Sequence, residues 1–472
     1  MSVAVVWFRR DLRLEDNPAL AAALHTHERV VLAYVHAPDE EAPWMPGAAS
    51  RWWLHHALGA LMADVRTRGA ELCLRTGPSA EALGEIVRAS GASAVHWNRL
   101  YEPAIARRDA RAAKALRASG VEVQTHNAHL LCEPDELRTR AGEPYRVFTP
   151  FWRNAREAIV PRPPVAAPKT IDAMRLGGTS LEALGLLPRH TWDGAFYELW
   201  RPGERGAQAA LRRFCDDALG DYARLRDFPA ERGTSRLSAH LHFGEIGPRQ
   251  VLWAVAERAR GRDTRMRAAV EAFVRELGWR EFAHHLLAHN PRMADRNLDT
   301  RFDAFPWARR NARLLERWQQ GRTGVPIVDA GMRELWTTGF MHNRVRMIVA
   351  SFLTKHLRQH WKLGARWFWD TLVDADLANN SQGWQWSAGC GADAAPYFRI
   401  FNPVTQAERF DPHGAYVRRW IPELADFPGS HVHAPWKMPE LLHRVGYPSP
   451  IVDLDASRAE ALAAFRSMRG AT

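Results

Sequence analysis

Residues 374–386 read DADLANNSQGWQW, and the chain continues as SAGCGADAAPYFRIFNP over residues 387–403. This stretch combines carboxylates, amides, tryptophans and an arginine with almost no aliphatic side chains. A hydrophobic core would not select such a mixture, because charged and amide side chains are rarely buried without partners. We therefore expect the stretch to bind a ligand that is both polar and aromatic.

The chain on either side of this stretch has a helical pattern. Apolar residues recur with helical spacing over most of the region after residue 205, and no strand-rich segment interrupts them. The expected helices span residues 205–219, 248–259, 265–288, 311–319, 328–336, 341–358 and 364–373. Residues 205–472 are therefore predicted to form an all-helical domain.

The first 130 residues have a different pattern, in which short apolar runs alternate with amphipathic segments. Strands are expected at 3–8, 29–36, 71–75, 94–98 and 121–125, with helices near 15–25, 49–68, 79–90 and 103–119. This alternation predicts an α/β domain with a parallel, Rossmann-like sheet covered on both faces. No GxGxxG motif follows the first strand, so the usual dinucleotide fingerprint is absent.

Residues 131–204 show little sustained periodicity and contain PRPPVAAPKT at 161–170. Proline-rich segments of this kind are typical of extended linkers. We expect a linker that wraps over the surface between an α/β domain at 1–130 and the helical domain at 205–472.

Composition narrows the class of partner and the compartment. The formal net charge is +11, from 64 basic and 53 acidic residues, which favours attraction to a phosphate backbone. The four cysteines are scattered without a CxxC pair, which argues against a disulfide framework or a zinc site. No signal sequence and no run of eighteen apolar residues occurs. We expect a cytoplasmic monomer that does not enter membranes.

Three further motifs, together with the opening stretch, identify a family. VVWFRRDLRLEDNPAL at 5–20, GTSRLSAHLHFGEIGPRQ at 233–250 and FNP at 401–403 resemble the photolyase/cryptochrome family, most closely its cyclobutane pyrimidine dimer photolyases. The resemblance implies FAD in the helical domain, damaged DNA containing pyrimidine dimers as partner, and light-driven carbon–carbon lyase activity. A cryptochrome-type photoreceptor and a six-four photolyase are the alternatives.

The resemblance also assigns cofactor residues. The residues that follow Gly233 have hydroxyls and N–H groups that could cap a helix and hold an anion, or form an ordinary capped turn. In similar proteins this segment and a tyrosine grip the pyrophosphate and ribose of FAD, and an arginine–aspartate pair flanks the isoalloxazine ring. The implied cofactor residues are Tyr222, Thr234, Ser235, Arg236, Leu237, Ser238, Arg346, Asp374 and Asp376.

Asn380 matches the family position that faces flavin N5, which is asparagine in photolyases and aspartate in plant cryptochromes. A carboxylic acid there can protonate N5, whereas an amide can only hydrogen-bond. Asn380 therefore favours repair over signalling.

Lesion and DNA contacts follow from the same resemblance. Two flipped-out bases need stacking surfaces and polar partners, which the family places at Glu276, Trp279, Asn343, Met347 and Trp386. Glu276 and Trp279 are three residues apart, and Asn343 and Met347 four apart, so each pair shares a helix face. Six-four photolyases use a histidine pair at this surface, and Met347 argues against that substrate. The implied phosphate contacts are Arg226, Arg280, Arg344 and Arg399.

Electron transfer and light harvesting complete the implied site. Trp384, Trp361 and Trp307 match the tryptophan relay that reduces photoexcited FAD, and Trp367 or Trp369 could provide a branch. The segment GAASRWWLHHAL at 47–58 resembles a folate-binding subgroup, although Ile105 replaces the glutamate of the best-known folate site. We favour methenyltetrahydrofolate as the antenna over 8-hydroxydeazaflavin; an empty site is the third alternative.

A metal site is not expected. His285 and His289 are spaced as a helical metal-ligand pair, next to His284. However, no acidic third ligand lies near them in the sequence.

Overall fold

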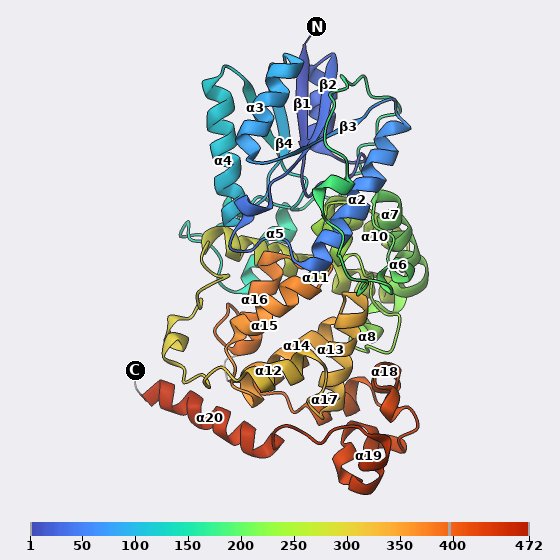
Figure 1. Ribbon diagram of the computed structural model, residues 1–472, viewed down its shortest axis with the longest axis vertical. Helices are drawn as coiled ribbons and strands as arrows, with labels where there is room; N and C mark the ends of the chain where they lie inside the picture. Colours follow the sequence, from blue (N-terminus) through green and yellow to red (C-terminus); the bar gives the residue numbers. More distant parts are fainter. Residues whose placement is uncertain (1, 395–397, 471–472) are drawn as a thin grey trace.

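The computed structural model of the protein describes residues 2–394 and 398–470, so that 395–397 of the opening stretch lie outside it. A parallel sheet of five strands has the order β3-β2-β1-β4-β5 (Figure 1). Each strand lies within one residue of its predicted position, which confirms the α/β prediction. The strands are β1 (Val3–Phe8), β2 (Arg29–His36), β3 (Leu72–Thr76), β4 (Ala94–Asn98) and β5 (Glu122–His126).

Helices cover both faces of the sheet because the central strand is apolar on both sides. Val6 and Phe8 of β1 belong to one core cluster, whereas Val5 and Trp7 belong to another. Successive side chains of a strand point to opposite faces, so VAVVWF contributes to both cores. The first cluster includes α1 (Pro18–Thr26) and α2 (Ala48–Arg66), and the second α3 (Ser79–Ser90) and α4 (Pro103–Ala118).

The predicted surface linker is wrong for one segment. Within 131–204 the structure contains α5 (Phe148–Ala158), whose Phe148, Phe151, Trp152 and Ala155 are buried against the helical part. These positions have i, i+3, i+4, i+7 spacing, a signal that the proline-rich surroundings obscured. The segment also contains the short helix α6 (Phe196–Leu199). The domain boundaries at 130 and 204 stay predictions.

The second part of the chain is helical, as predicted (Figure 1). The helix expected over 341–358 begins at Asn343, after the cap residue His342, and is replaced at Phe352–His356 by a π-helical turn. The helices are α7 (Glu204–Arg213), α8 (Tyr222–Leu225), α9 (Ser238–His242), α10 (Pro248–Ala259), α11 (Thr264–His289), α12 (Ala312–Gln319), α13 (Pro326–Thr338), α14 (Asn343–Ser351), α15 (Trp361–Thr371), α16 (Leu377–Ala388), α17 (Pro403–Phe410), α18 (Ala415–Trp420), α19 (Pro439–Val445) and α20 (Leu454–Gly470).

Helix α16 contains residues 377–388 of the opening stretch and was not predicted as a helix. The Asp376 carboxylate accepts the Asn379 N–H at its start, and Gly389 ends it with a left-handed φ of +96°. Helix α16 packs against α11, α14 and α15, so these helices surround its side chains.

The start of α2 is fixed to α15 of the helical part. A Cβ at Gly47 would overlap the Trp369 carbonyl oxygen, so only glycine allows this approach. Ala48 N donates to Asp370 Oδ1 at 2.9 Å, and Trp369 Nε1 donates to the Met45 carbonyl at 2.6 Å. The two parts of the chain therefore share a tight, hydrogen-bonded junction. Among the described residues, no helix has the length and apolar character needed to cross a membrane.

Candidate functional site

The predicted ion pair of Arg346 and Asp374 is present. Arg346 Nη2 donates to both Asp374 oxygens at 3.1 and 2.9 Å, and its Nε donates to the Met341 carbonyl at 2.7 Å. The Asp374 side chain is 3% exposed and that of Arg346 24% exposed. The carboxylate is thus committed to holding the arginine, while part of the guanidinium remains accessible to an anion.

The amide of Asn380 is oriented by α15. Its Nδ2 donates to the Ala365 carbonyl at 2.9 Å. Since the amide nitrogen is engaged there, the oxygen is turned to the other side and can accept a hydrogen bond from a further donor.

The helix-capping prediction for residues 234–238 is wrong. Helix α9 begins at Ser238, and its cap residue Leu237 has no side-chain cap hydrogen bond. The Ser235 hydroxyl instead accepts the Leu237 N–H at 3.4 Å, which forms a local turn before the helix. The segment still offers groups to a ligand, because Arg236 and Ser238 are exposed and Thr234 is half-buried.

Two other predicted cofactor residues are buried. Leu237 belongs to the core, so only its backbone could meet a cofactor. Tyr222 packs edge-on against Phe273, with ring centroids 5.3 Å apart, and burial raises the pKa of its hydroxyl.

The predicted cofactor residue Asp376 is buried, and its carboxylate has partners within the protein, so its contact with a cofactor stays a prediction. Its Oδ1 accepts two hydrogen bonds from Asn379, and its Oδ2 lies 3.4 Å from His284 Nε2 and 3.5 Å from His242 Nδ1. Burial alone would raise the pKa of Asp376, but His284 and His242 together lower it by more. The net result is a pKa well below the usual value. The carboxylate is therefore engaged by its own helix and by two histidines.

The structure supplies the acidic partner that the sequence around His284 lacks. His129, His284 and Asp376 lie within 4.8 Å of one another, a spacing compatible with metal ligands. However, Arg280 donates to His129 Nε2 at 3.0 Å, which places the remaining ring proton on Nδ1. His285 is also engaged, since its Nε2 accepts the Tyr145 N–H at 3.0 Å. The group therefore has the hydrogen bonding of an ion-paired cluster rather than of a metal site.

Arg280 was predicted to contact DNA phosphate, but its side chain has internal partners in this structure, and the DNA contact stays a prediction. Its side chain is 11% exposed, and it donates to the His129 carbonyl at 2.9 Å and to Glu281 at 3.1 Å. The Arg280 side chain therefore points from α11 into the protein. The sequence motif does not reveal this direction.

The remaining lesion residues come from neighbouring helices. Glu276 lies on α11, Asn343 and Met347 lie on α14, and Trp386 lies on α16. Asn343 is exposed and the other three are half-buried, and their role in lesion binding stays a prediction. Trp386 Nε1 donates to the Asp393 carbonyl at 3.2 Å, and the Arg399 guanidinium lies 5.9 Å from its ring centroid.

Trp279 is only partly available for stacking. Its ring stacks on Phe148 of α5, with centroids 3.7 Å apart and planes 7° from parallel. One face of the indole is therefore covered by the segment that the sequence assigned to a linker. The role of Phe148 as a backing ring was missed for the same reason.

Alternating charges connect the predicted lesion and phosphate residues. Arg226 donates to Glu276 at 2.6 Å, Arg226 lies 3.9 Å from Asp227, and Arg344 pairs with Asp227 at 2.9 Å. Both arginines are thus ion-paired within the protein. A phosphate must compete with these carboxylates for the two arginines or share the arginines with them. The sequence could not indicate this competition.

The predicted relay tryptophans lie on packed elements. Trp384 packs on Gly364 of α15, where a Cβ would overlap its ring, and Trp361 lies one turn earlier on that helix. The His360 ring contacts both other rings, with its centroid 5.7 Å from that of Trp361 and 4.9 Å from that of Trp307. For the branch, Trp367 stacks on the exposed Trp336, with centroids 6.0 Å apart, whereas Trp369 packs on Trp44.

Known proteins resemble the chain over its whole length. Residues 4–169 match the family described as DNA photolyase, and residues 273–467 match the FAD binding domain of DNA photolyase. A deoxyribodipyrimidine photo-lyase of Agrobacterium fabrum is 44% identical, over 99% of this chain and 98% of the relative. The chain belongs to the photolyase/cryptochrome family.

Relatives in this family include both enzymes and cryptochromes. The structure of a bacterial class III photolyase from Agrobacterium tumefaciens superimposes with a TM-score of 0.94, at 43% identity, covering 100% of this chain and 98% of the other. Cryptochrome-1 of Arabidopsis thaliana is 38% identical, over 98% of this chain and 70% of the relative. The photo-lyase matches support a lyase that carries FAD and takes part in DNA repair, but overall identity alone does not separate the two branches.

The donor set fits FAD. Accessible hydroxyl and guanidinium groups at Thr234, Arg236 and Ser238 suit phosphate oxygens. The partly exposed guanidinium of Arg346 suits an electron-rich ring, and Asn380 Oδ1 suits an N–H donor. These are the residues that would hold the cofactor.

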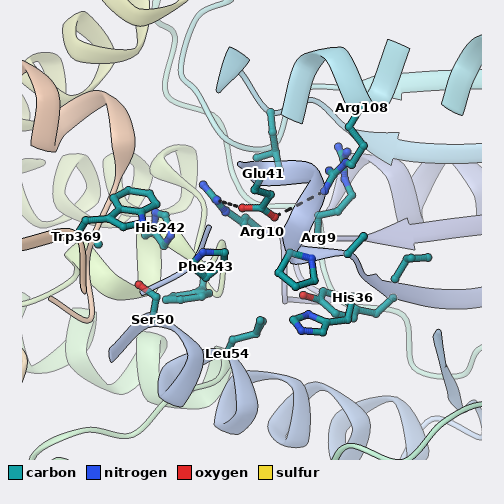
Figure 2. A pocket seen from close by; sticks show the side chains of 17 residues that line it. Arg9, Arg10, His36, Glu41, Ser50, Leu54, Arg108, His242, Phe243 and Trp369 are labelled. Atoms are coloured by element: carbon teal, nitrogen blue, oxygen red, sulfur yellow. Dashed lines mark hydrogen bonds and ion pairs between the residues drawn. The ribbon is translucent and has the colours of Figure 1, made fainter. Parts of the chain in front are cut away.

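A separate cavity lies at the carboxyl edge of the sheet (Figure 2). It is bounded by Arg9 and Arg10 after β1 and by His36 at the end of β2, and Trp369 closes it from the helical part. Open α/β sheets bind ligands at this edge, where the strand order reverses. Ser50 and Leu54 of the predicted folate segment line the cavity, but its tryptophan pair, Trp52 and Trp53, is buried in the core instead.

Proposed function

We propose that the protein is a cyclobutane pyrimidine dimer photolyase that repairs damaged DNA under blue light. The observation that supports the proposal is the grouping of Glu276, Met347 and Trp386 on α11, α14 and α16. Helices α14 and α16 also carry Arg346 and Asn380, and Asp374, the partner of Arg346, lies just before α16. Stacking and hydrogen-bonding groups thus lie on the same elements as the groups suited to the flavin.

The alternatives are opposed by single residues. Asn380 cannot donate a proton to the ring as a carboxylic acid would, which disfavours a cryptochrome-type photoreceptor. Met347 takes the position of a histidine expected in a six-four photolyase, which disfavours that substrate. Because Cryptochrome-1 is 38% identical, these residues carry more weight than overall similarity.

On this proposal, bound FAD supplies light-driven electron transfer, and the protein supplies geometry and charge. Arg346 stabilises negative charge on the ring, and Asp374 prevents the guanidinium from turning away. Trp386 and the free face of Trp279 stack against the flipped bases, while Glu276 and Asn343 bond their polar edges. Arg226, Arg344 and Arg399 bind the neighbouring phosphates. Trp384, Trp361 and Trp307 deliver electrons to oxidised FAD.

We further propose a light-harvesting chromophore at the carboxyl edge of the sheet, methenyltetrahydrofolate in preference to 8-hydroxydeazaflavin. A photolyase structure from Sulfolobus tokodaii contains two FAD molecules, so a second chromophore has precedent among similar structures. The free volume of the cavity is about 40 Å³, far below a typical ligand pocket, so lining side chains must move when a chromophore enters. Difference absorption after adding each candidate to purified protein would distinguish them, and no uptake would indicate an empty site.

The decisive experiment measures repair. Protein with chemically reduced FAD is mixed with oligonucleotides that contain one cyclobutane dimer or one six-four lesion, in blue light and in darkness. We expect restored thymines only from the cyclobutane dimer and only in light. Absence of repair, despite bound reduced FAD and DNA binding, would favour a photoreceptor. We expect the protein to act as a cytoplasmic monomer.

A further inference from the structure

Asn297, which none of the family motifs includes, contacts the middle tryptophan of the proposed relay. Trp361 is fully buried, and its Nε1 donates to Asn297 Oδ1 at 2.8 Å. The orientation of this amide is fixed independently, because Asn297 Nδ2 donates to Asp303 Oδ1 at 2.7 Å. A carboxylate can only accept, so the nitrogen must face Asp303 and the oxygen must face the indole.

The chemistry of this contact is important when Trp361 loses an electron. An oxidised tryptophan is a cation and a much stronger acid than the neutral indole. A neighbouring carboxylate would take its proton, whereas an amide oxygen accepts a hydrogen bond without becoming protonated near neutral pH. Loss of the proton would trap the vacancy on Trp361, because the neutral radical is harder to reduce than the cation.

The surroundings of Trp361 favour onward transfer to Trp307. The Lys362 ammonium lies 5.9 Å from the Trp361 ring centroid and opposes a lasting positive charge there. The His360 ring between the two indoles is a weak base, since burial lowers its pKa to about 4. Its Nδ1 also accepts the Lys362 N–H at 3.2 Å. Asn297, Trp307 and His360 line a cavity of about 500 Å³, so the end of the relay is open to small reductants.

We propose that Asn297 is a positioning residue of the relay that keeps the proton on oxidised Trp361, so that the electron vacancy moves on to Trp307. Trp384 gives one electron to the photoexcited flavin, Trp361 refills Trp384, and Trp307 refills Trp361. One electron has then entered the ring, one vacancy is on Trp307, and no proton has left Trp361. This inference rests on the relay proposed above.

The test exchanges the amide of residue 297 with the carboxylate of residue 303. In the double variant Asn297→Asp/Asp303→Asn, a carboxylate faces Trp361, while the total charge and the bond between the two side chains are kept. Asp303→Asn alone is the matched control, since it leaves the amide at 297. Transient absorption after a laser flash distinguishes protonated from deprotonated tryptophan radicals by their visible spectra.

In the double variant we expect deprotonation of the Trp361 radical to accelerate by at least about 10²-fold, the usual effect of a well-placed base. We also expect slower deprotonation in D₂O and a lower yield of oxidised Trp307, whereas the control should behave as wild type. A merely structural role for Asn297 would leave the radical spectra unchanged in the double variant, and that result would overturn the inference. If wild type forms no tryptophan radical at all, the relay itself fails, which is a distinguishable outcome.

Discussion

Glu276 has two partners on the proposed function, the lesion and Arg226. The variant Glu276→Ala removes a polar partner of the pyrimidine dimer. It also releases Arg226, which donates to the Glu276 carboxylate at 2.6 Å. We therefore expect weaker discrimination between damaged and undamaged DNA, by about 1 to 3 kcal/mol, with undamaged binding unchanged or stronger.

Fluorescence titration with both DNAs would measure this discrimination. Glu271→Ala is the matched control, because Glu271 is on the same helix and pairs with the exposed Arg156. Equal losses for both DNAs, or loss of FAD, would place Glu276 outside the lesion site.

Asn380→Asp tests the control of protonation at the ring. The Ala365 carbonyl that accepts from the Asn380 amide at 2.9 Å would face a carboxyl group, which favours the protonated acid. We expect a different visible spectrum during photoreduction and a changed rate of reoxidation in air. The same spectra and rates as wild type would remove the main reason for preferring a photolyase to a cryptochrome.

Helix α15 connects several functions, because it carries Trp361, the Gly364 platform under Trp384 and the Ala365 carbonyl that orients Asn380. Trp384→Phe should therefore abolish photoreduction of oxidised FAD while keeping the ring packed on Gly364. Repair by chemically reduced protein should persist. Photoreduction that survives in Trp384→Phe would direct attention to Trp367 and Trp336, whose rings stack toward the surface.

Which elements could be predicted depended on how their side chains are used. Strand β1 and helix α10 follow apolar periodicity, and both were predicted with the correct bounds. Helix α16 was missed because its buried positions mix apolar residues with the polar Ser381 and Gln385, which obscures the helical pattern, and its start depends on the Asp376 cap. Helix α5 was missed because a short amphipathic segment lies close to a proline-rich one.

The candidate site was predictable where the family resemblance named both partners of a pair, and it was not where one partner lies outside the residues that it named. Arg346 and Asp374 form the expected ion pair. In contrast, the inward direction of Arg280, the link from Asp376 to His284 and the bond of Asn297 to Trp361 depend on packing between segments far apart in the chain.

Buried histidines should make the whole fold sensitive to mild acid. Burial lowers the pKa of His96, His285, His342 and His360 to about 4, below the usual 6.5. The unfolded chain then binds more protons than the folded one between these values, so the free energy of unfolding should fall as pH drops from about 6.5 toward 4. The raised pKa of His284 acts in the opposite sense but is a single group.

Urea unfolding at pH 7 and pH 5 would measure this effect. His342→Asn should reduce the difference by about 1 to 2 kcal/mol, because Asn can still cap α14 without a titrating ring. An unchanged pH dependence in that variant would show that His342 titrates normally in the folded protein.

The junction at Gly47 has an optical consequence. Because α2 begins directly against the Trp369 carbonyl, the sheet and the helical bundle cannot rotate past each other without breaking that contact. If the proposed antenna chromophore binds the sheet part, its transition dipole and that of FAD in the helical part would keep a fixed mutual angle and separation, and resonance energy transfer depends steeply on both. A bulkier residue at 47 would then change the efficiency of energy transfer between the two proposed chromophores, even where each binding site remained intact.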